Sequence, residues 1–260
     1  MDQQAISRQY ASSANLAARI ALHQRFSSNA YGLQRWVFDR LDVSGRARVL
    51  EIACGTGSLW RENLDRLPPT PHLFLSDISL SMLKTTEEVL RGAGRDAQFA
   101  ACALPDLPFA DDSFDLVVAN HMLYHVADRL RGLREIHRVL RHGGAFFAAT
   151  NGVDHLRELK GLMRGLAIEA ADASLSFTLE NGAAQLRPVF GDVPYAEYAD
   201  SLRVTDPEAL MDYIASVSPF AAETVRERRS ELLSSIAAGT GADGTFHVVK
   251  STGAFMARKT

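Results

Sequence analysis

The sequence predicts an α/β protein built on a mostly parallel β-sheet with helices on both faces. Two observations carry this prediction: a strand–turn–helix unit at residues 49–64, and an alternation of short apolar runs with helical stretches from residue 47 to residue 150. Runs rich in Val, Leu and Phe that alternate with helical segments are typical of a parallel sheet covered on both sides. The length of 260 residues allows one large domain or a domain with a cap.

The strand–turn–helix unit indicates a nucleotide-binding device. Residues 49–57 read VLEIACGTG, and the helix opening SLWRENL follows at once. Glycine lets the backbone adopt φ > 0 and lets a ligand approach closely. The start of a helix offers unpaired N–H groups and a positive dipole potential.

The spacing of the glycines and acids indicates which class of nucleotide this unit is suited to bind. Gly55 and Gly57 supply G-x-G, but Trp60 occupies the place of the third glycine of the dinucleotide fingerprint, where an indole is expected to disturb helix–strand packing. Glu51 precedes the turn, and Asp77 follows it by twenty residues at the end of a second apolar run. A carboxylate at that position can accept hydrogen bonds from both ribose hydroxyls. A nucleoside with a small uncharged-to-cationic tail therefore fits better than a pyrophosphate.

The composition indicates which classes of binding partner we expect and which we do not. The chain is 47% hydrophobic and 23% charged, which is ordinary for a soluble globular protein. A net charge of -3 gives no reason to expect nucleic acid. No apolar run approaches a membrane span, and the N-terminus carries no evident signal peptide, so we expect a cytoplasmic protein with no membrane partner. Cys54 and Cys102 are expected to be reduced thiols. The oligomeric state is not indicated.

The two ends of the chain do not follow the alternation. Residues 5–43 predict helices interrupted at 27–29, with an aromatic stripe from Trp36 to Leu41 that packs against the core. Beyond residue 152 the patterns predict a helix over 154–170, a short amphipathic stretch ending at residue 190, a strand over 193–204, a helix after the capping box at 205–208, a helix over 220–237 and a final strand over 246–258.

Four sequence blocks occur in order between residues 46 and 150. They are LEIACGTG at 50–57, SDISLSML at 76–83, LPFADDSFDLVVANHMLYHV at 107–126 and LREIHRVLRHGGAFFAAT at 133–150. With these blocks the chain resembles the class I S-adenosylmethionine-dependent methyltransferases of the small-molecule type. Ala53 departs from the family pattern, which has glycine there.

The resemblance implies a Rossmann-like, seven-stranded, mostly parallel sheet whose last strand is antiparallel. It also implies an N-terminal helical lid over 1–43 and a cofactor-binding domain over 44–260, with cap or insertion segments at 152–200 and 218–240. Ligands of such sheets bind outside the carboxyl ends of the strands. Four residues at or near strand ends are therefore expected to converge on one crevice: Glu51, Asp77, Ala103 and Asn120.

The resemblance also implies contacts with S-adenosylmethionine. The backbone of Gly55 and Gly57, in the turn that begins at Ala53, would pass close to the cofactor. Glu51 would orient this turn or contact the methionine amine, and Asp77 would hold the ribose.

Ile78 and Met82 would pack against adenine, and Ala103 and Leu104 stand where the family has an acidic residue followed by a backbone N–H group. Ala103 offers no carboxylate, so adenine recognition would use the main chain and apolar contacts, with Asp106 as a misplaced substitute.

The methionyl end of the cofactor has four further candidates. Asn120 and His121 would face the methionyl group, and either Tyr10 or Arg25 would reach its carboxylate. Ordinary use of Asp77 and Asn120 in turns and caps is the alternative to a cofactor role.

His121, Tyr124 and His125 are the catalytic candidates. Histidines four residues apart on a helix share a face, as zinc ligands do, but the intervening glutamate of H-E-x-x-H and a third ligand are missing, so no metal is expected. Three roles stay open for these histidines: a base, a group that orients the acceptor, or polar support of the loop. The cofactor's methyl is already activated, so catalysis can consist largely of positioning.

We therefore predict methyl transfer to a small, partly hydrophobic metabolite, with O-, N- and C-acceptors undetermined. Candidate lining residues are Trp36, Tyr124, Met163, Phe177, Phe190 and Tyr195. The alternatives are a cofactor-binding enzyme with a non-methyl reaction such as cyclisation, a catalytically silent binding subunit and, least favoured, a dehydrogenase.

Overall fold

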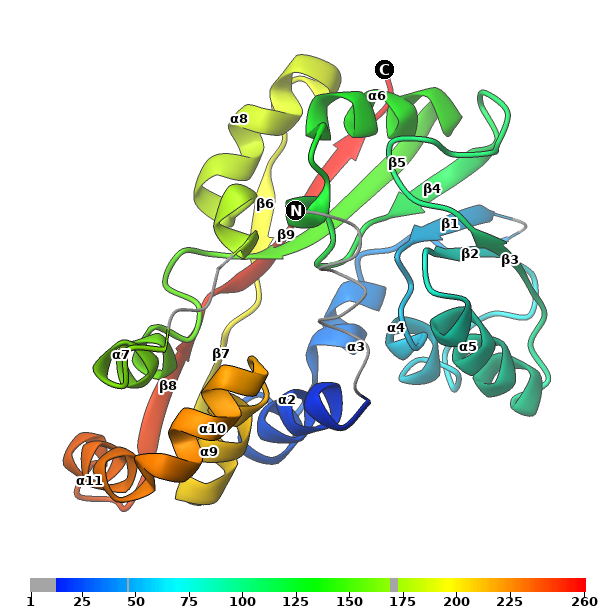
Figure 1. The fold of residues 1–260 in the computed structure, drawn as a ribbon. Helices are drawn as coiled ribbons and strands as arrows, with labels where there is room; N and C mark the ends of the chain where they lie inside the picture. Colours follow the sequence, from blue (N-terminus) through cyan, green and yellow to red (C-terminus); the bar gives the residue numbers. More distant parts are fainter. Residues whose placement is uncertain (1–12, 46, 169–172) are drawn as a thin grey trace. The chain divides into compact units, whose positions relative to one another are not determined.

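The computed structural model describes residues 13–45, 47–168 and 173–260 (Figure 1). The chain divides into two compact units. The sheet unit comprises residues 31–153, 174–198 and 252–260, and the helical unit comprises residues 1–30, 154–173 and 199–251. The segment 31–43, expected to belong to an N-terminal lid, groups with the sheet unit.

The sheet unit contains a seven-stranded sheet in the order β3-β2-β1-β4-β5-β9-β6. Its strands are β1 (Arg48–Ile52), β2 (His72–Asp77), β3 (Ala97–Ala101), β4 (Phe114–Val118), β5 (Leu140–Asn151), β6 (Tyr195–Glu197) and β9 (Thr252–Arg258). The first five strands in this order are parallel, whereas β9 is antiparallel to β5 and β6 is antiparallel to β9. The predicted Rossmann-like sheet with an antiparallel last strand is confirmed.

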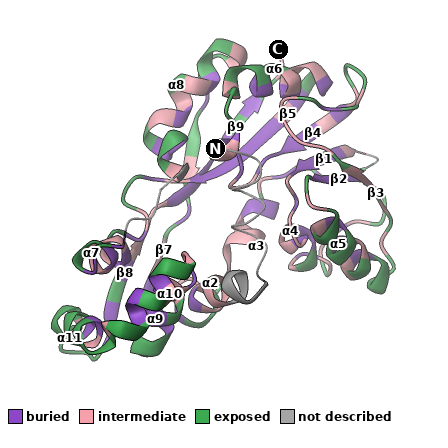
Figure 2. Ribbon diagram, in the orientation of Figure 1, coloured by how far each residue is buried: buried purple, intermediate pink, exposed green. Residues whose placement is uncertain are grey.

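Both faces of this sheet are buried by helices (Figure 2). Successive residues of one strand enter different cores: Leu50 lies in one cluster and Val49 in the other. This alternation explains why the strands read as continuous apolar runs. The first cluster includes residues of α6 (Arg129–Val139) and α8 (Leu179–Phe190), and the second includes residues of α3 (Leu33–Phe38), α4 (Ser58–Arg61) and α5 (Leu80–Gly92).

The helical unit has its own apolar core and a two-stranded antiparallel sheet of β7 (Asp200–Val204) and β8 (Phe246–Lys250). Its helices are α2 (Ser13–Phe26), α7 (Arg157–Gly165), α9 (Pro207–Ala215), α10 (Pro219–Glu227) and α11 (Arg229–Gly239). In the described ranges, no helix of either unit has the length and apolar character needed to cross a bilayer.

Two predicted strands each prove to be two strands in different sheets. The run 193–204 forms β6 and β7, and the run 246–258 forms β8 and β9. The chain passes from one unit to the other between Tyr198 and Ala199, and again between Ser251 and Thr252. An alternating pattern continues through both crossings because it reports only which residues face a core, not which sheet supplies the partner.

Three predicted helices were too long. The stretch 220–237 divides into α10 and α11 at Arg228, whose φ of -107° and ψ of 26° are not helical. The helix after Gly57 ends at Arg61, although its pattern continues towards residue 67. The helix over 154–170 is only Arg157–Gly165, and it follows Leu156 in a left-handed conformation.

The turn after β1 has left-handed backbone at alternate positions. Ala53, Gly55 and Gly57 have φ of 57°, 56° and 69°. A Cβ built on Gly57 would lie 2.6 Å from Cγ2 of Thr86 on α5, whereas one on Gly55 would meet no atom within 4 Å. The Thr86 hydroxyl also donates to the Gly55 carbonyl at 2.8 Å. Close packing of α5 against the turn therefore depends on Gly57.

We predict that Gly57→Ala lowers the free energy of unfolding by about 2–4 kcal/mol, since it adds overpacking against Thr86 to left-handed strain. Gly55→Ala should cost only about 1 kcal/mol, because it adds strain without a collision. Urea denaturation followed by circular dichroism measures both. Equal losses for the two variants would contradict the packing argument.

We predict that Ala53→Gly changes stability in the opposite direction, by up to about 1 kcal/mol. Removing the Cβ relieves left-handed strain of about 1–2 kcal/mol, and the greater freedom of glycine in the unfolded chain offsets about half of it. The same denaturation experiment measures this gain. A loss of more than 1 kcal/mol would show that the Ala53 methyl group contributes packing that outweighs the strain.

The helical unit is held together at Asp200 by a buried polar network. The Asp200 side chain is 0% exposed and pairs with Lys250, which is 8% exposed. Its carboxylate also accepts from Ser27 Oγ at 2.6 Å and from the backbone N–H of Asn29 at 3.1 Å. Burial alone would raise the pKa of Asp200, but the hydrogen bonds from Lys250 and Ser27 and the Lys250 charge lower it overall. One carboxylate thus joins the segment after α2 to β7 and β8.

We predict that Asp200→Asn lowers the free energy of unfolding by about 3 kcal/mol at pH 7, because it removes the buried carboxylate that pairs with Lys250. A lowered native pKa stabilises the fold above the unfolded value near 4, and this contribution disappears as the pH falls through the native pKa. Urea denaturation at pH 7 and pH 3 measures both effects. Glu231→Gln, which breaks the exposed pair with Arg228, is the control and should change stability far less, because solvent screens an exposed pair.

Candidate functional site

The carboxyl ends of β1, β2 and β4 bring Glu51, Asp77 and Asn120 to one edge of the sheet. Glu51 is in register with Leu75 of β2 and with Val118 of β4. Asp77 ends β2, and Asn120 follows β4 by two residues. Because these strands are parallel neighbours, the three side chains gather as the sequence predicted.

Asp77 binds the turn to the start of α5. Its Oδ2 accepts the Gly55 N–H at 3.0 Å, and its Oδ1 accepts the Ser79 N–H at 2.9 Å. The side chain is buried, with 8% exposed. A carboxylate has about four acceptor sites, so Asp77 retains capacity for hydroxyl donors. Its use in a turn and its predicted ribose role are therefore compatible.

Glu51 is an acid in an apolar interior. The residue is 3% exposed, and its Oε2 accepts the Trp60 indole N–H at 2.6 Å. Burial raises the pKa of Glu51 to about 8, although the Trp60 hydrogen bond and the nearby Asn120 amide oppose this and the negative charge of Asp77 reinforces it. Within the described ranges, no Lys, Arg or His forms an ion pair with Glu51.

The side-chain amide of Asn120 is buried without well-formed hydrogen bonds to the described residues. Its amide lies close enough to Glu51 to lower the pKa of that acid. Yet the amide nitrogen and oxygen are both inaccessible to solvent and make no hydrogen bond of good geometry to the part of the chain that the structure describes. Buried side-chain amides are almost always satisfied. Together with the open space beside Gly55, this indicates room for a polar ligand.

Trp60 was misjudged from the sequence. Its indole was expected to disturb the packing of helix and strand, but it is fully buried and packs edge-on against Phe38, with ring centroids 6.5 Å apart. Trp60 lies on the single-turn helix α4, and its indole N–H reaches Glu51 on β1. An indole nine residues after a buried acid was the available signal, and spacing alone could not show that the two groups meet.

The residues predicted to contact adenine occupy different environments. Ile78 is 40% exposed and Met82 is partly buried on the first turn of α5. Ala103 and Leu104 lie just beyond the end of β3, but the Leu104 side chain packs on the core near Gly132. Only the main chain of Leu104 is therefore left for a ligand.

Asp106, considered as a substitute for the missing acid, pairs with Arg131 instead.

The catalytic candidates lie on the loop after β4. His121 has φ of 52° and donates its N–H to the Ala149 carbonyl at 2.9 Å, while His125 ends the short 3₁₀ helix η1 (Leu123–His125). His121 and His125 do not lie on one helix, because η1 begins at Leu123 and α6 begins at Arg129. The rings of Tyr124 and His125 are 4.6 Å apart, and burial lowers the pKa of His125.

This loop is anchored by two side chains. Arg129 Nε donates to the Leu123 carbonyl at 2.9 Å, and Ser176 Oγ donates to the Tyr124 carbonyl at 3.0 Å.

Both thiols, Cys54 and Cys102, are unpaired, and burial raises the pKa of each. In the ranges that the structure describes, no three His, Cys, Asp or Glu side chains are grouped so as to hold a metal ion.

Two further residues, Tyr10 and Arg25, were predicted to contact the methionyl end of the cofactor. Tyr10 lies outside the described residues. Arg25 belongs to the helical unit, where its guanidinium pairs with Asp206 at 2.8 Å, and its contact with a cofactor stays a prediction.

Part of the predicted acceptor lining lies in the apolar cores instead, whereas Trp36, Tyr124 and Tyr195 stay predicted lining residues. Phe177 is 0% exposed and packs on Phe255, while Phe190 stacks on Phe146, so both belong to the core beneath α8. Met163 is buried in the core of the helical unit. Trp36 packs edge-on against Tyr198, with ring centroids 5.5 Å apart, and Tyr195 is 46% exposed on β6.

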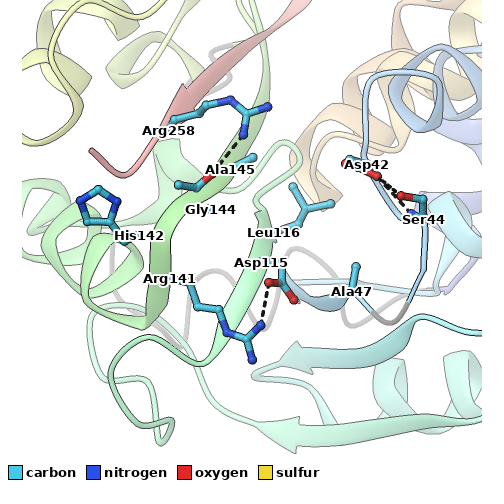
Figure 3. A pocket seen from close by; sticks show the side chains of 11 residues that line it. Asp42, Ser44, Ala47, Asp115, Leu116, Arg141, His142, Gly144, Ala145 and Arg258 are labelled. Carbon is cyan, nitrogen blue, oxygen red and sulfur yellow. Dashed lines mark hydrogen bonds and ion pairs between the residues drawn. The ribbon is translucent and has the colours of Figure 1, made fainter.

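A separate cavity of about 480 Å³ lies at the opposite edge of the sheet (Figure 3). Its walls come from the segment before β1, the beginnings of β4 and β5 and the end of β9. Arg141 in this cavity pairs with Asp115 at 2.8 Å, and Arg258 donates to the Gly143 carbonyl. Because ligands of such sheets bind at the carboxyl ends of the strands, this cavity is not the candidate site.

Comparison with known proteins identifies the central segment. Residues 50–148 match the family model described as a methyltransferase domain. The chain is 38% identical over 113 residues to a ubiquinone/menaquinone biosynthesis C-methyltransferase of Hahella chejuensis, a match that covers 43% of this chain and 45% of that protein. The chain thus spans less than half the length of this curated relative.

Solved structures show the same fold over a longer stretch. The YcgJ protein of Bacillus subtilis superposes with a TM-score of 0.59 at 16% identity, covering 87% of this chain and 97% of that one. A S-adenosylmethionine-dependent methyltransferase of Thermotoga maritima gives 0.55 at 17% identity, covering 97% and 99%. The segment that carries the turn, Asp77 and Asn120 therefore matches a methyltransferase domain model, and the chain shares the fold of these structures.

Proposed function

We propose that this protein transfers the methyl group of S-adenosylmethionine to a small, partly hydrophobic metabolite. One observation carries the proposal: Glu51, Asp77 and the unsatisfied amide of Asn120 meet at a glycine turn on the carboxyl edge of a methyltransferase sheet. The residues present fit this cofactor, because they combine acceptors for hydroxyl and ammonium donors with space next to the backbone.

Each part of the cofactor has proposed partners. Asp77 would accept from the ribose hydroxyls, and Glu51 and Asn120 would bind the amine end of the methionyl group. Ile78 and Met82 would cover adenine. The exposed apolar surface of Ile78 would then be removed from water, which favours binding. The contribution of Ala103 and Leu104 would come from the main chain, and His121, Tyr10 and Arg25 remain proposed contacts of the methionyl end.

The cofactor supplies an electrophilic methyl group on a positively charged sulfur. The chain therefore has to hold the acceptor in line with that methyl, and it needs no nucleophilic side chain of its own. His125 is proposed to accept a proton where the acceptor carries one. Because burial lowers its pKa below the ordinary value of 6.5, its imidazole is neutral and basic at pH 7. Tyr124 and His121 are proposed to orient the acceptor.

The acceptor itself is proposed only as a class. The relative from Hahella chejuensis is described as a C-methyltransferase, but the matched segment corresponds to the cofactor half of the fold. Segments outside it, including the proposed lid over 1–43 and cap segments at 152–200 and 218–240, would select the acceptor. The unpaired thiols agree with a reducing cytoplasm as its location.

The proposal is tested with methyl-labelled S-adenosylmethionine and a pool of small metabolites. We expect label in a metabolite product, and binding of S-adenosylhomocysteine by titration calorimetry. Asp77→Asn should weaken that binding about 10- to 100-fold, since it removes a charged acceptor. Asp65→Asn, in an exposed pair with Arg35, is the matched control and should bind like the native chain.

The outcomes separate the alternatives. Folded native protein that binds neither form of the cofactor would disprove the proposal. Tight binding without transfer to any metabolite would favour a non-methyl reaction such as cyclisation, or a silent binding subunit.

A further inference from the structure

We propose that the buried pair of Glu51 and Trp60 makes cofactor binding proton-linked: the ligand's α-ammonium group occupies the place of a counter-ion for Glu51, and the carboxyl group releases one proton to solvent. This inference rests on the proposed function. It assigns a role to Trp60. It also predicts the number of protons released per ligand bound, which can be measured separately from methyl transfer.

The first step in the argument is the burial of an acid without a cation. Glu51 is 3% exposed and forms no ion pair with the described Lys, Arg and His side chains. An ionised carboxylate in such a place is unfavourable unless it is paired, so the group takes up a proton instead. Burial accordingly raises the pKa of Glu51 to about 8. At neutral pH the ligand-free site therefore holds a neutral acid.

The groups that face Glu51 do not supply the missing positive charge. From β2 comes Asp77, whose negative charge raises the pKa of Glu51 further, and from the turn comes the Cys54 thiol, whose own pKa is raised by burial and by both carboxylates. From α4 comes the Trp60 indole, and from the segment after β4 the Asn120 amide, both uncharged. Two acids and three uncharged groups thus form a site suited to a cation.

A cationic ligand reverses the preference for the neutral acid. An ammonium group beside the carboxyl favours its ionised form, so the O–H bond of Glu51 breaks and the proton passes to solvent. The resulting carboxylate keeps the Trp60 hydrogen bond and gains the ammonium as its partner. Binding and ionisation are then coupled, and affinity falls as protons compete with the ligand for Glu51.

Trp60 acts as a positioning residue in this scheme. Its N–H donates to Glu51 Oε2 at 2.6 Å, and the fully buried ring, packed against Phe38, fixes the direction of that donor. A donor directed at the carboxylate favours the ionised form and lowers the pKa of Glu51 relative to burial alone. Without it, more of the acid would be protonated near pH 8.

The test is titration calorimetry of the native chain with S-adenosylhomocysteine at pH 7, in buffers of different ionisation enthalpy. We expect release of about 0.9 proton per ligand bound, because a group with a pKa of about 8 is about nine-tenths protonated at pH 7. Affinity should fall about 50-fold between pH 8 and pH 6. Methylthioadenosine, which lacks the amine, should bind without this release.

Glu51→Gln is the control, because glutamine resembles the neutral acid but cannot ionise. It should release about 0.9 proton fewer than the native chain, a difference that cancels any titration of the ligand's own amine. Trp60→Phe keeps the ring and removes the donor, so it should raise proton release at pH 8 from about 0.5 towards 1. Circular dichroism verifies that both variants fold.

Binding of S-adenosylhomocysteine with the same proton count in native and Glu51→Gln protein would overturn the inference and leave the proposed function standing. So would equal release with methylthioadenosine. An absence of any binding to native protein would instead remove the proposed function, on which this inference depends. Should Glu51→Gln not fold, the native measurement alone decides, because release of less than about 0.2 proton at pH 7 excludes ionisation of Glu51.

Discussion

The site depends on the carboxylate of Asp77, which joins three pieces of the chain. One oxygen accepts the N–H of Gly55 in the turn after β1, and the other accepts the N–H of Ser79, which caps α5. The turn is thereby tied to the neighbouring strand and to the helix that follows it. Charge-assisted hydrogen bonds to backbone are among the stronger ones in proteins, so the turn is organised before any ligand arrives.

Around this tie, the fold places groups that are unfavourable in isolation. Glu51 is buried without a cation, the Asn120 amide lacks partners among the described residues, and Ala53 adopts a left-handed conformation. Each costs stability that a structural role does not require. Their concentration within one turn and two strand ends is typical of a binding site, where the ligand supplies the missing interactions.

The division into two units separates the matched segment from the rest of the chain. The matched methyltransferase segment lies entirely in the sheet unit, whereas the helical unit is assembled from parts of the chain before and after that segment. Its buried Asp200 network and separate apolar core make it a folded body of its own.

The sequence by itself determined the sheet, the turn and the resemblance to methyltransferases. Continuous apolar runs, glycines at fixed spacing and acids at strand ends are local patterns, and they predicted that Glu51, Asp77 and Asn120 would meet. Tertiary structure alone decided that Trp60 bonds to Glu51, that Phe177 and Phe190 belong to the core, and that the runs 193–204 and 246–258 each divide between two sheets. The physical reason is that periodicity reports which side of an element is buried, whereas the partner it is buried against is set by contacts between residues far apart in the chain.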